Sequence, residues 1–294
     1  MRPSTANIWW MAIRPKTLGA AIAPVLMGIA IAWRSDVGHL GAALAALVGA
    51  LLLQIAANFA NDYFDFKKGA DDERRVGPVR VVSAGYVSPG TMRIAIGLAL
   101  LAVVPIAGYL VWRAGPAFAA IAAAAMLFAI LYTGGPLPLA YVGLGDIAAF
   151  FFFGPVAVAG TYAAQAQRFD WLPAIAGIGP GCLAMTLLAV NNLRDRVGDA
   201  AVGKRTLAVR FGAGFARAEI VLSVVAAAVV PVVLALETRQ WFAMLATLSC
   251  ATMVPWLRRV VGGAEGMELN RVLAATGKLL VLYGGAFALG WILT

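Results

Sequence analysis

Residues 49–69 read GALLLQIAANFANDYFDFKKG, and this stretch combines the two properties that decide the fold. Its first half belongs to an apolar run that is long enough to cross about 30 Å of hydrocarbon. Its second half carries two carboxylates, Asp62 and Asp65. Carboxylates are costly to desolvate where an apolar helix ends, so they usually mark an ion or substrate site. The stretch therefore predicts a membrane helix with a functional site at one end.

The rest of the chain has the same apolar character. Of its 294 residues, 62% are hydrophobic and only 13% are charged, and the mean hydropathy is +0.86. A soluble domain of this size does not need so many apolar residues, so we predict an all-α, polytopic protein that is embedded in a lipid bilayer. The net charge of +9 lies in short segments between apolar runs, where cations set topology and contact anionic lipid or phosphate. We therefore do not expect a nucleic-acid partner.

Nine apolar runs are long enough to be transmembrane helices. They lie near residues 17–33, 38–60, 92–112, 115–131, 143–164, 172–190, 217–236, 240–257 and 272–292. No linker or soluble domain is indicated between them, so we expect one transmembrane domain over residues 1–294. Cys182 and Cys250 lie inside apolar runs and are expected to be core residues, and the lone His39 is expected in a solvated loop.

The positive residues predict the orientation of the nine helices. With the N-terminus inside, 18 of the 23 lysines and arginines fall in cytoplasmic segments. Only Arg34, Arg113, Arg168 and Arg239 fall on the opposite side, and Lys278 lies within the last apolar run. The positive-inside rule then predicts a multi-pass protein of the cell membrane, bacterial inner or plasma, with its N-terminus and both acidic clusters facing the cytoplasm.

The first acidic cluster continues a polar stripe along the helix predicted over residues 38–60. If that helix extends through the cluster, Gln54, Asn58 and Asp62 recur on one face, with Asn61 and Asp65 offset by one turn. We include Asn58 among the expected substrate-binding residues. The stripe leads from the apolar run to the cytoplasmic end of the helix.

The second acidic cluster repeats this design in the other half of the chain. Asn191, Asp195 and Asp199 recur at four-residue spacing after the run over 172–190, so a second oxygen-rich face can oppose the first. Carboxylate and amide oxygens without nearby His or Cys suit Mg²⁺, which binds few carboxylates and completes its shell with water and phosphate oxygens. The expected metal ligands are Asn61, Asp62, Asp65, Asn191, Asp195 and Asp199.

Basic residues follow each cluster closely. A diphosphate leaving group gains negative charge as its bond to carbon breaks, and Lys or Arg together with Mg²⁺ can stabilise that charge. The expected contacts are Lys67, Arg74, Arg80, Lys204 and Arg205, with Lys16 and Arg14 near the N-terminus. The alternative for each cation is that it only anchors its segment inside. The roles of Asp71 and Asp72 stay open, because a charge run in a loop is usually solvated.

Several motifs resemble the UbiA superfamily of intramembrane prenyltransferases, and more narrowly its 1,4-dihydroxy-2-naphthoate polyprenyltransferases. The resemblance runs from about residue 9 to 212. It is carried by residues 14–18 (RPKTL), 61–65 (NDYFD), 67–71 (KKGAD), 75–80 (RVGPVR), 132–136 (YTGGP), 153–156 (FGPV), 191–195 (NNLRD) and 203–208 (GKRTLA). One departure is Gly69, where the superfamily pattern places an aspartate; the nearest acid is Asp71. This shifted spacing is typical of the naphthoate branch.

The resemblance implies a central cavity that holds a polyprenyl diphosphate through Mg²⁺, with Asp62, Asp65 and Asp195 as catalytic residues. It also implies a polar ring near the reacting centre, for which Tyr132 is the candidate; the alternative is an interfacial tyrosine. The implied reaction is ionisation of the allylic diphosphate, attack by the naphthoate ring and loss of CO₂, giving demethylmenaquinone in menaquinone biosynthesis. Phe150, Phe151, Phe152 and Phe153 are candidates to line the chamber.

Two other functions remain open at this point. A related prenyltransferase could use a different aromatic acceptor, such as 4-hydroxybenzoate. A cation-coupled transporter could also bind its ion through paired acidic motifs. The transporter is the weaker alternative, because the acids lie at one membrane face and not at the midplane.

Overall fold

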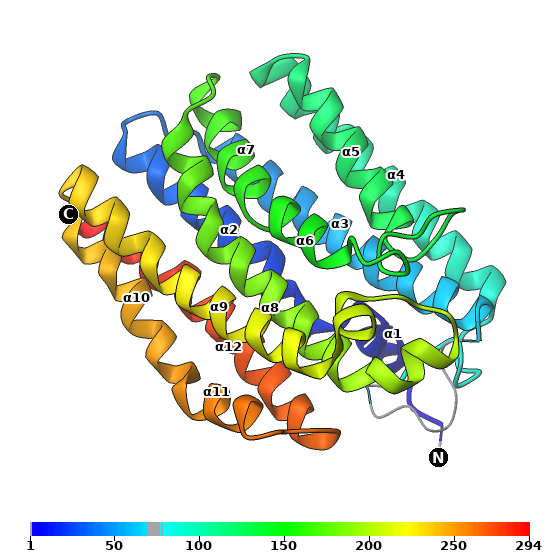
Figure 1. Ribbon diagram of the computed structural model, residues 1–294. Helices are drawn as coiled ribbons and strands as arrows, with labels where there is room; N and C mark the ends of the chain where they lie inside the picture. Colours follow the sequence, from blue (N-terminus) through cyan, green and yellow to red (C-terminus); the bar gives the residue numbers. More distant parts are fainter. Residues whose placement is uncertain (1, 70–76, 78) are drawn as a thin grey trace.

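The computed structural model describes residues 2–69, 77 and 79–294, and all regular secondary structure in these ranges is helical. Figure 1 shows the long helices running side by side, with the N- and C-termini at opposite ends of the bundle. The seven segments that are long and apolar enough to cross a membrane are α2 (Pro15–Arg34), α3 (Leu40–Lys67), α4 (Pro89–Ala114), α6 and α7 together (Gly145–Ala166), α8 (Trp171–Ala201), α9 (Leu207–Thr238) and α12 (Met267–Leu293). The prediction of an all-α, multi-pass membrane protein is confirmed.

The two other predicted spans have a different form. Residues 115–131 correspond to α5 (Ala117–Leu131), an apolar helix of 15 residues. Residues 240–257 fall in a series of short pieces: η1 (Trp241–Met244), α10 (Leu245–Cys250), η2 (Ala251–Met253) and α11 (Val254–Val261). The count of nine therefore stays a prediction. Helix α1 (Thr5–Ile13) was not predicted, because at nine residues it is too short to span a membrane.

Polar side chains fix where several helices begin. Ser88 and Asp170 accept hydrogen bonds from backbone N–H groups in the first turns of α4 and α8, and Thr206 does so for α9. Such N-caps satisfy donors that the helix itself leaves unpaired. His39, expected in a solvated loop, has the same role: its Nδ1 accepts the N–H of Ala42 at 3.1 Å and begins α3.

The segment from α6 (Gly145–Phe152) to α7 (Pro155–Ala166) is broken at Gly154, where it packs directly against α8. A Cβ atom on Gly154 would lie 2.5 Å from the carbonyl oxygen of Gly177, and one on Gly181 would lie 2.6 Å from that of Phe150. Only glycine allows backbones to approach this closely. The contact holds the broken segment against the helix that carries the second acidic cluster.

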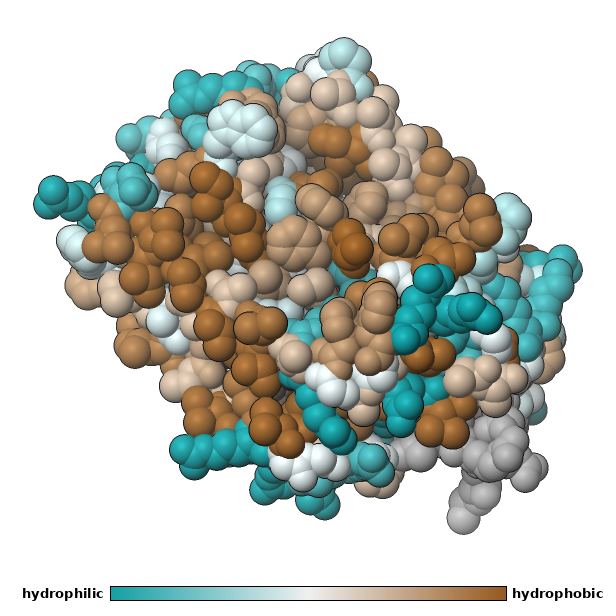
Figure 2. All heavy atoms as spheres, viewed as in Figure 1, coloured by the Kyte–Doolittle hydropathy of each residue, from teal (hydrophilic) through white to brown (hydrophobic). Residues whose placement is uncertain are grey.

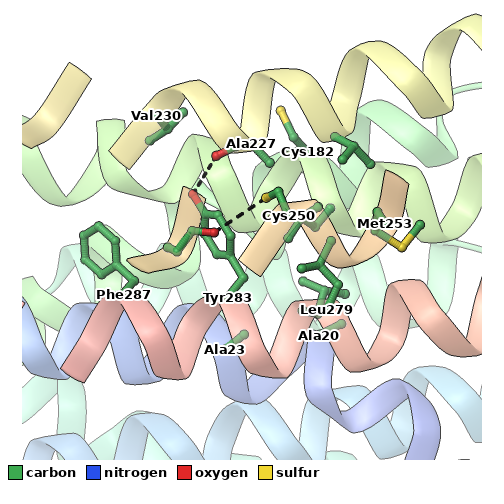
Figure 3. Close-up of a cluster of buried hydrophobic side chains, with 14 of the residues drawn as sticks. Ala20, Ala23, Cys182, Ala227, Val230, Cys250, Met253, Leu279, Tyr283 and Phe287 are labelled. Atoms are coloured by element: carbon green, nitrogen blue, oxygen red, sulfur yellow. Dashed lines mark hydrogen bonds between the residues drawn. The ribbon is translucent and has the colours of Figure 1, made fainter. Parts of the chain in front are cut away.

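The main core joins α2, α8, α9, α10 and α12 around Tyr283, as Figure 3 shows. The buried Tyr283 hydroxyl donates a hydrogen bond to the carbonyl oxygen of Ala227 at 2.9 Å. Cys182 and Cys250 are buried and free in this core, as predicted. Outside the core, apolar residues cover a broad area of the visible face in Figure 2, which is the surface expected to meet lipid.

Candidate functional site

A cavity with about 1150 Å³ of empty space, including its opening to solvent, lies at the end of the bundle where both clusters are found. We call it the polar chamber. Its polar walls are formed by Arg14, Thr17, Gln54, Asn58, Asn61, Asp65, Arg80, Tyr132, Thr133, Asn191, Asn192 and Lys204. The chamber therefore brings together residues of the two clusters that are separated by 126 or more positions in the chain.

Helix α3 continues through the first cluster to Lys67, as the sequence indicated. Gln54, Asn58, Asn61 and Asp65 form one stripe along the chamber wall. At about 100° per residue, Asn61 and Asp65 lie within roughly 20° of Gln54, whereas Asp62 lies about 80° away. Helix geometry thus selects Asn61 and Asp65, and not Asp62, for the chamber.

Asp62 has a different position and different partners. Its side chain is buried with 1% of its surface exposed, and its carboxylate accepts hydrogen bonds from the backbone N–H groups of Val81 at 3.1 Å and Val82 at 3.3 Å. Asp62 is not part of the described wall of the chamber. Both carboxylate oxygens hold the turn that follows Arg80. The metal-binding and catalytic role of Asp62 stays a prediction.

Asp65 faces the chamber, where the side chains of Arg80 and Tyr141 contact its carboxylate. Arg80 Nη2 donates to its Oδ2 at 2.7 Å, and the hydroxyl of Tyr141 donates to its Oδ1 at 3.3 Å. Because both Asp65 and Arg80 are largely buried, this ion pair is shielded from water. The structure therefore places an acid and a cation of the predicted site in direct contact.

A second network joins the end of α3 to the loop after α5. Thr133 Oγ1 donates to Asn61 Oδ1 at 2.8 Å, and Lys68 Nζ donates to the carbonyl oxygen of Thr133 at 2.7 Å. The Lys68 ammonium also lies 3.8 Å from the centre of the Tyr141 ring. Desolvation lowers the pKa of Lys68, although the nearby Asp65 charge acts in the opposite direction. These contacts fix Asn61 at the chamber wall.

The second cluster lies along the last turns of α8. Arg194 binds Asp195 with two contacts, Nε to Oδ1 at 2.7 Å and Nη2 to Oδ2 at 2.6 Å. It also donates to Asn191 Oδ1 at 2.6 Å and to Asn270 Oδ1 of α12 at 2.7 Å. Of the predicted ligands in this cluster, Asn191 lines the chamber, while Asp195 lies one turn further along the helix.

Asp199 lies another turn beyond Asp195 and is buried. Lys204 Nζ contacts its Oδ1 at 3.2 Å, whereas its Oδ2 is buried without a hydrogen-bond partner. An unpaired carboxylate oxygen in a buried position is costly unless a ligand or ion engages it. Lys204 itself lines the chamber.

The predicted cations do not all reach the site. Arg80 and Lys204 line the chamber, whereas Lys16 and Lys67 are exposed. Arg205 lines a second hollow with Arg210 and Phe211; this hollow shares Lys204 with the chamber, but Arg205 is not part of the chamber wall. Arg74, Asp71 and Asp72 lie outside the described residues.

Some chamber residues were missed or left open by the sequence analysis. Arg14 lines the chamber from the junction of α1 and α2, where its φ of 54° is left-handed. Thr17, Thr133 and Asn192 also line the chamber and were not predicted as site residues. All three lie inside motifs that carried the resemblance, so the motifs were the available signal.

Tyr132 lies at the end of α5 and lines the chamber, as predicted for a polar ring near the centre. Burial, followed by the charges of Asp146, Asp65 and Asp199, raises the pKa of its hydroxyl above the ordinary value. The hydroxyl is therefore neutral at physiological pH and can donate a hydrogen bond.

An apolar cavity with about 1040 Å³ of empty space adjoins the chamber. Its walls come from α2, α3, α4, α5, α6 and α7, and it shares Gln54, Ala57, Phe128 and Phe153 with the chamber. Phe152 also lines it, whereas Phe151 is half exposed on the outer surface. The site thus consists of a polar compartment joined to an apolar one.

Comparison with known proteins agrees with this architecture. Residues 21–292 match the UbiA prenyltransferase family. The chain belongs to this family. It is 35% identical to a 1,4-dihydroxy-2-naphthoate octaprenyltransferase of Haemophilus influenzae, over 97% of this chain and 95% of that protein. It is 38% identical to the protein of the same name in Mycobacterium tuberculosis, over 96% of this chain and 97% of that protein.

Two solved structures show that the fold is shared by distant family members. The apo structure of a UbiA homolog from Aeropyrum pernix K1 matches with a TM-score of 0.72 at 14% identity, covering 92% of this chain and 97% of that one. A UbiA homolog from Archaeoglobus fulgidus bound to GPP and Mg²⁺ matches with a TM-score of 0.66, also at 14% identity, covering 98% of this chain and 100% of that one.

Proposed function

We propose that this chain transfers a polyprenyl group from an allylic polyprenyl diphosphate to 1,4-dihydroxy-2-naphthoate, with loss of CO₂, to give demethylmenaquinol, the reduced form of demethylmenaquinone. The observation that carries the proposal is the junction of the polar chamber with the apolar cavity through Gln54, Ala57, Phe128 and Phe153. A prenyl diphosphate has the same two parts, a charged head and an apolar tail. The names of the sequence relatives support the naphthoate as the acceptor.

The chamber fits a Mg²⁺–diphosphate head group. Asn61, Asp65 and Asn191 have oxygens at its wall; Asn61 Oδ1 and Asn191 Oδ1 each accept one protein hydrogen bond and keep a second lone pair for an ion. The unpartnered Oδ2 of Asp199 lies further along α8, outside the chamber wall. The described residues contain no cluster of three or more His, Cys, Asp or Glu side chains around one point. Mg²⁺ is typically coordinated by one or two carboxylates together with other oxygen ligands and the phosphate oxygens of the substrate. When bound, the ion would supply positive charge to the departing diphosphate.

Arg80 and Lys204 are the cations that stabilise the leaving group. As the C–O bond of the allylic diphosphate breaks, its electron pair moves to the ester oxygen that joined the first phosphate to the prenyl carbon. Arg80 forms an ion pair with Asp65, and Lys204 forms one with Asp199. The acidic clusters therefore hold the guanidinium group of Arg80 and the ammonium group of Lys204 at the chamber. Fixed charges in a water-poor site stabilise developing charge more strongly than charges in water.

The apolar cavity binds the prenyl tail and keeps water from the allylic cation. Phe128 and Phe153 line both compartments and present aromatic rings where the cation forms, and ring faces stabilise positive charge. The naphthoate ring attacks the cation through a ring carbon. The carboxylate leaves as CO₂, and its bonding electrons stay on the ring carbon that carried it, which takes up a proton. The attacked ring carbon loses its own proton, so the aromatic diol is restored.

The proposal includes the orientation predicted from the sequence, with both clusters on the cytoplasmic side of the cell membrane and one functional domain over the whole chain. Charged substrates made in the cytoplasm would then reach the chamber directly. Labelling of single cysteines at exposed positions, such as Lys67→Cys and Trp171→Cys, tests this orientation. A membrane-impermeant reagent added to intact cells should label only the second.

The decisive experiment uses the purified protein in detergent with a polyprenyl diphosphate, Mg²⁺ and 1,4-dihydroxy-2-naphthoate. We expect a prenylated, decarboxylated product, loss of turnover with EDTA and recovery with added Mg²⁺. Prenylation of 4-hydroxybenzoate alone would show that the acceptor assignment is wrong. Turnover of neither acceptor would contradict the proposed enzyme activity, and cation-driven uptake in proteoliposomes would then be measured.

A further inference from the structure

Asp146 and Asn192 form a buried pair, and neither residue is among the predicted metal ligands of the two acidic clusters. Asp146 lies in the first turn of α6 with 1% of its surface exposed, and Asn192 lies in α8 with 6% exposed. The amide Nδ2 of Asn192 donates to Asp146 Oδ1 at 3.0 Å and to Oδ2 at 3.2 Å. Asn192 belongs to the wall of the polar chamber, whereas Asp146 lies behind that wall.

The carboxylate fixes which way the amide of Asn192 points. An ionised carboxylate only accepts hydrogen bonds, so the NH₂ group must face Asp146 and the carbonyl oxygen must face away. No hydrogen bond from the described residues engages that carbonyl oxygen. The chamber wall therefore contains a hydrogen-bond acceptor of fixed orientation that the protein itself leaves available.

Tyr132 lies in the same corner of the chamber. A Cβ atom on Gly145, the residue before Asp146, would lie 3.4 Å from the Tyr132 hydroxyl, so the ring packs against the start of α6. The charge of Asp146 contributes, after burial, to the raised pKa of that hydroxyl. The corner thus combines the neutral phenol of Tyr132 with the oriented amide oxygen of Asn192.

Only one of the reactants can satisfy this acceptor. A diphosphate near neutral pH offers oxygen acceptors, and a prenyl tail offers no polar hydrogen. An aromatic diol offers two hydroxyl donors. We propose that Asn192, oriented by Asp146, accepts a hydrogen bond from a ring hydroxyl of the aromatic acceptor. This inference rests on the proposed function and adds the residue that positions the acceptor ring.

The arrangement also has a chemical consequence for the ring. A hydroxyl that donates a hydrogen bond gains electron density on its oxygen, and this density is delocalised into the ring carbons that attack the allylic cation. Asn192 is therefore a substrate-binding residue, and Asp146 is a positioning residue that acts through it. The two lie on α6 and α8, which the glycine contact at Gly154 and Gly177 holds together.

The test compares Asn192→Leu with Asn191→Leu, a matched change at the neighbouring position, in detergent-purified protein of verified thermal stability. We expect Asn192→Leu to raise the KM for 1,4-dihydroxy-2-naphthoate about three- to tenfold, the effect of one neutral hydrogen bond. The KM values for the prenyl diphosphate and Mg²⁺ should stay unchanged. Asn191→Leu should instead raise the KM for Mg²⁺ or diphosphate. If Asn192→Leu does not fold, Asn192→Ser replaces it.

Two further measurements separate positioning from simple structural support. Asp146→Asn keeps an oxygen that accepts the hydrogen bond from Asn192, so this variant should keep the wild-type KM for 1,4-dihydroxy-2-naphthoate. Asp146→Leu should raise this KM as much as Asn192→Leu does. The competitive inhibitors 1-hydroxy-2-naphthoate and 4-hydroxy-2-naphthoate should differ in affinity for the wild-type protein, and this difference should vanish in the Asn192 variant.

An increase confined to the KM for Mg²⁺ or diphosphate in Asn192→Leu would overturn the inference, because Asn192 would then belong to the metal site. An inhibitor preference that is the same in wild type and variant would also overturn it. Failure of the wild-type protein to prenylate any aromatic acceptor would contradict the proposed function itself, a result that the variants cannot produce.

Discussion

The two acidic clusters have similar sequences but are fixed in different ways. At the end of α3, Asp62 holds two backbone N–H groups of the following turn, and Asp65 alone of the two faces the chamber. At the end of α8, Asp195 and Asp199 are bound by the side chains of Arg194 and Lys204. A backbone contact is a permanent part of the fold, whereas a side-chain ion pair can exchange its partner for a ligand. From this difference we expect Asp62 to stabilise the fold, and Asp65, Asp195 and Asp199 to be available to substrate.

The largest effect is expected at Asp65. Replacing Asp65 by alanine removes the first cluster's carboxylate from the chamber and the partner of Arg80. We expect kcat to fall about 10²- to 10³-fold, the range found when one group that stabilises transition-state charge is removed. Steady-state turnover with saturating Mg²⁺ measures this loss. Turnover within tenfold of wild type would show that the diphosphate does not bind at the first cluster.

A second effect distinguishes the cations near the second cluster. Lys204→Met removes a charge from the chamber, and we expect turnover to fall roughly 10- to 100-fold. Arg205→Met is the matched control, because Arg205 is exposed and is not part of the chamber wall, and its turnover should stay within about threefold of wild type. Equal losses in both variants would show that the loop acts as a unit and would weaken the assignment of Lys204.

The third prediction concerns stability at Asp62. Asp62→Ala leaves the N–H groups of Val81 and Val82 buried without their acceptor, at about 1–3 kcal/mol each. We expect a lower Tm in detergent with an unchanged KM for Mg²⁺. Asp62→Asn keeps one acceptor oxygen and should lose less. An unchanged Tm with lost turnover would instead make Asp62 a metal ligand, as the sequence predicted.

The smallest effect is expected at Tyr141. Tyr141→Phe removes the 3.3 Å hydrogen bond to Asp65 but keeps the ring beneath Lys68. We expect turnover to fall by about three- to tenfold, in line with one hydrogen bond to a charged group that Arg80 still holds. A loss as large as that of Asp65→Ala would mean that Tyr141 contacts substrate directly.

The sequence predicted the helices well where apolar length alone decides them. The spans of α2, α4 and α12 agree with the predicted runs to within a few residues, because about 20 apolar residues in a chain of this hydropathy can only cross a membrane. Residues 240–257 were predicted as one helix but form short pieces. An apolar run predicts that a segment is buried in lipid or in the protein core, but it does not predict where a helix breaks.

The position of the candidate site was predicted in outline, and the sequence could not tell which polar residues line the chamber, for a geometric reason. Asn61 and Asp62 follow Asn58 by three and four residues, so either could lie on the same helix face as Asn58. Only the rotation added up along the helix from Gln54 to Asp65 shows that Asn61 lines the chamber and Asp62 does not. The pairing of Asp146 with Asn192 joins residues 46 positions apart. No local pattern contains such a contact, since it depends on how α6 packs against α8.

The glycine contact between the α6–α7 break and α8 has a consequence for tolerance to substitution. Gly154 and Gly177 belong to neither acidic cluster, yet each allows less than 3 Å for a Cβ atom against the other's backbone. Even alanine would force the two segments apart, and Phe153 and Asn192 would shift relative to each other. Natural variation at these two positions should therefore be as restricted as at the chamber itself, for reasons of spacing and not of chemistry.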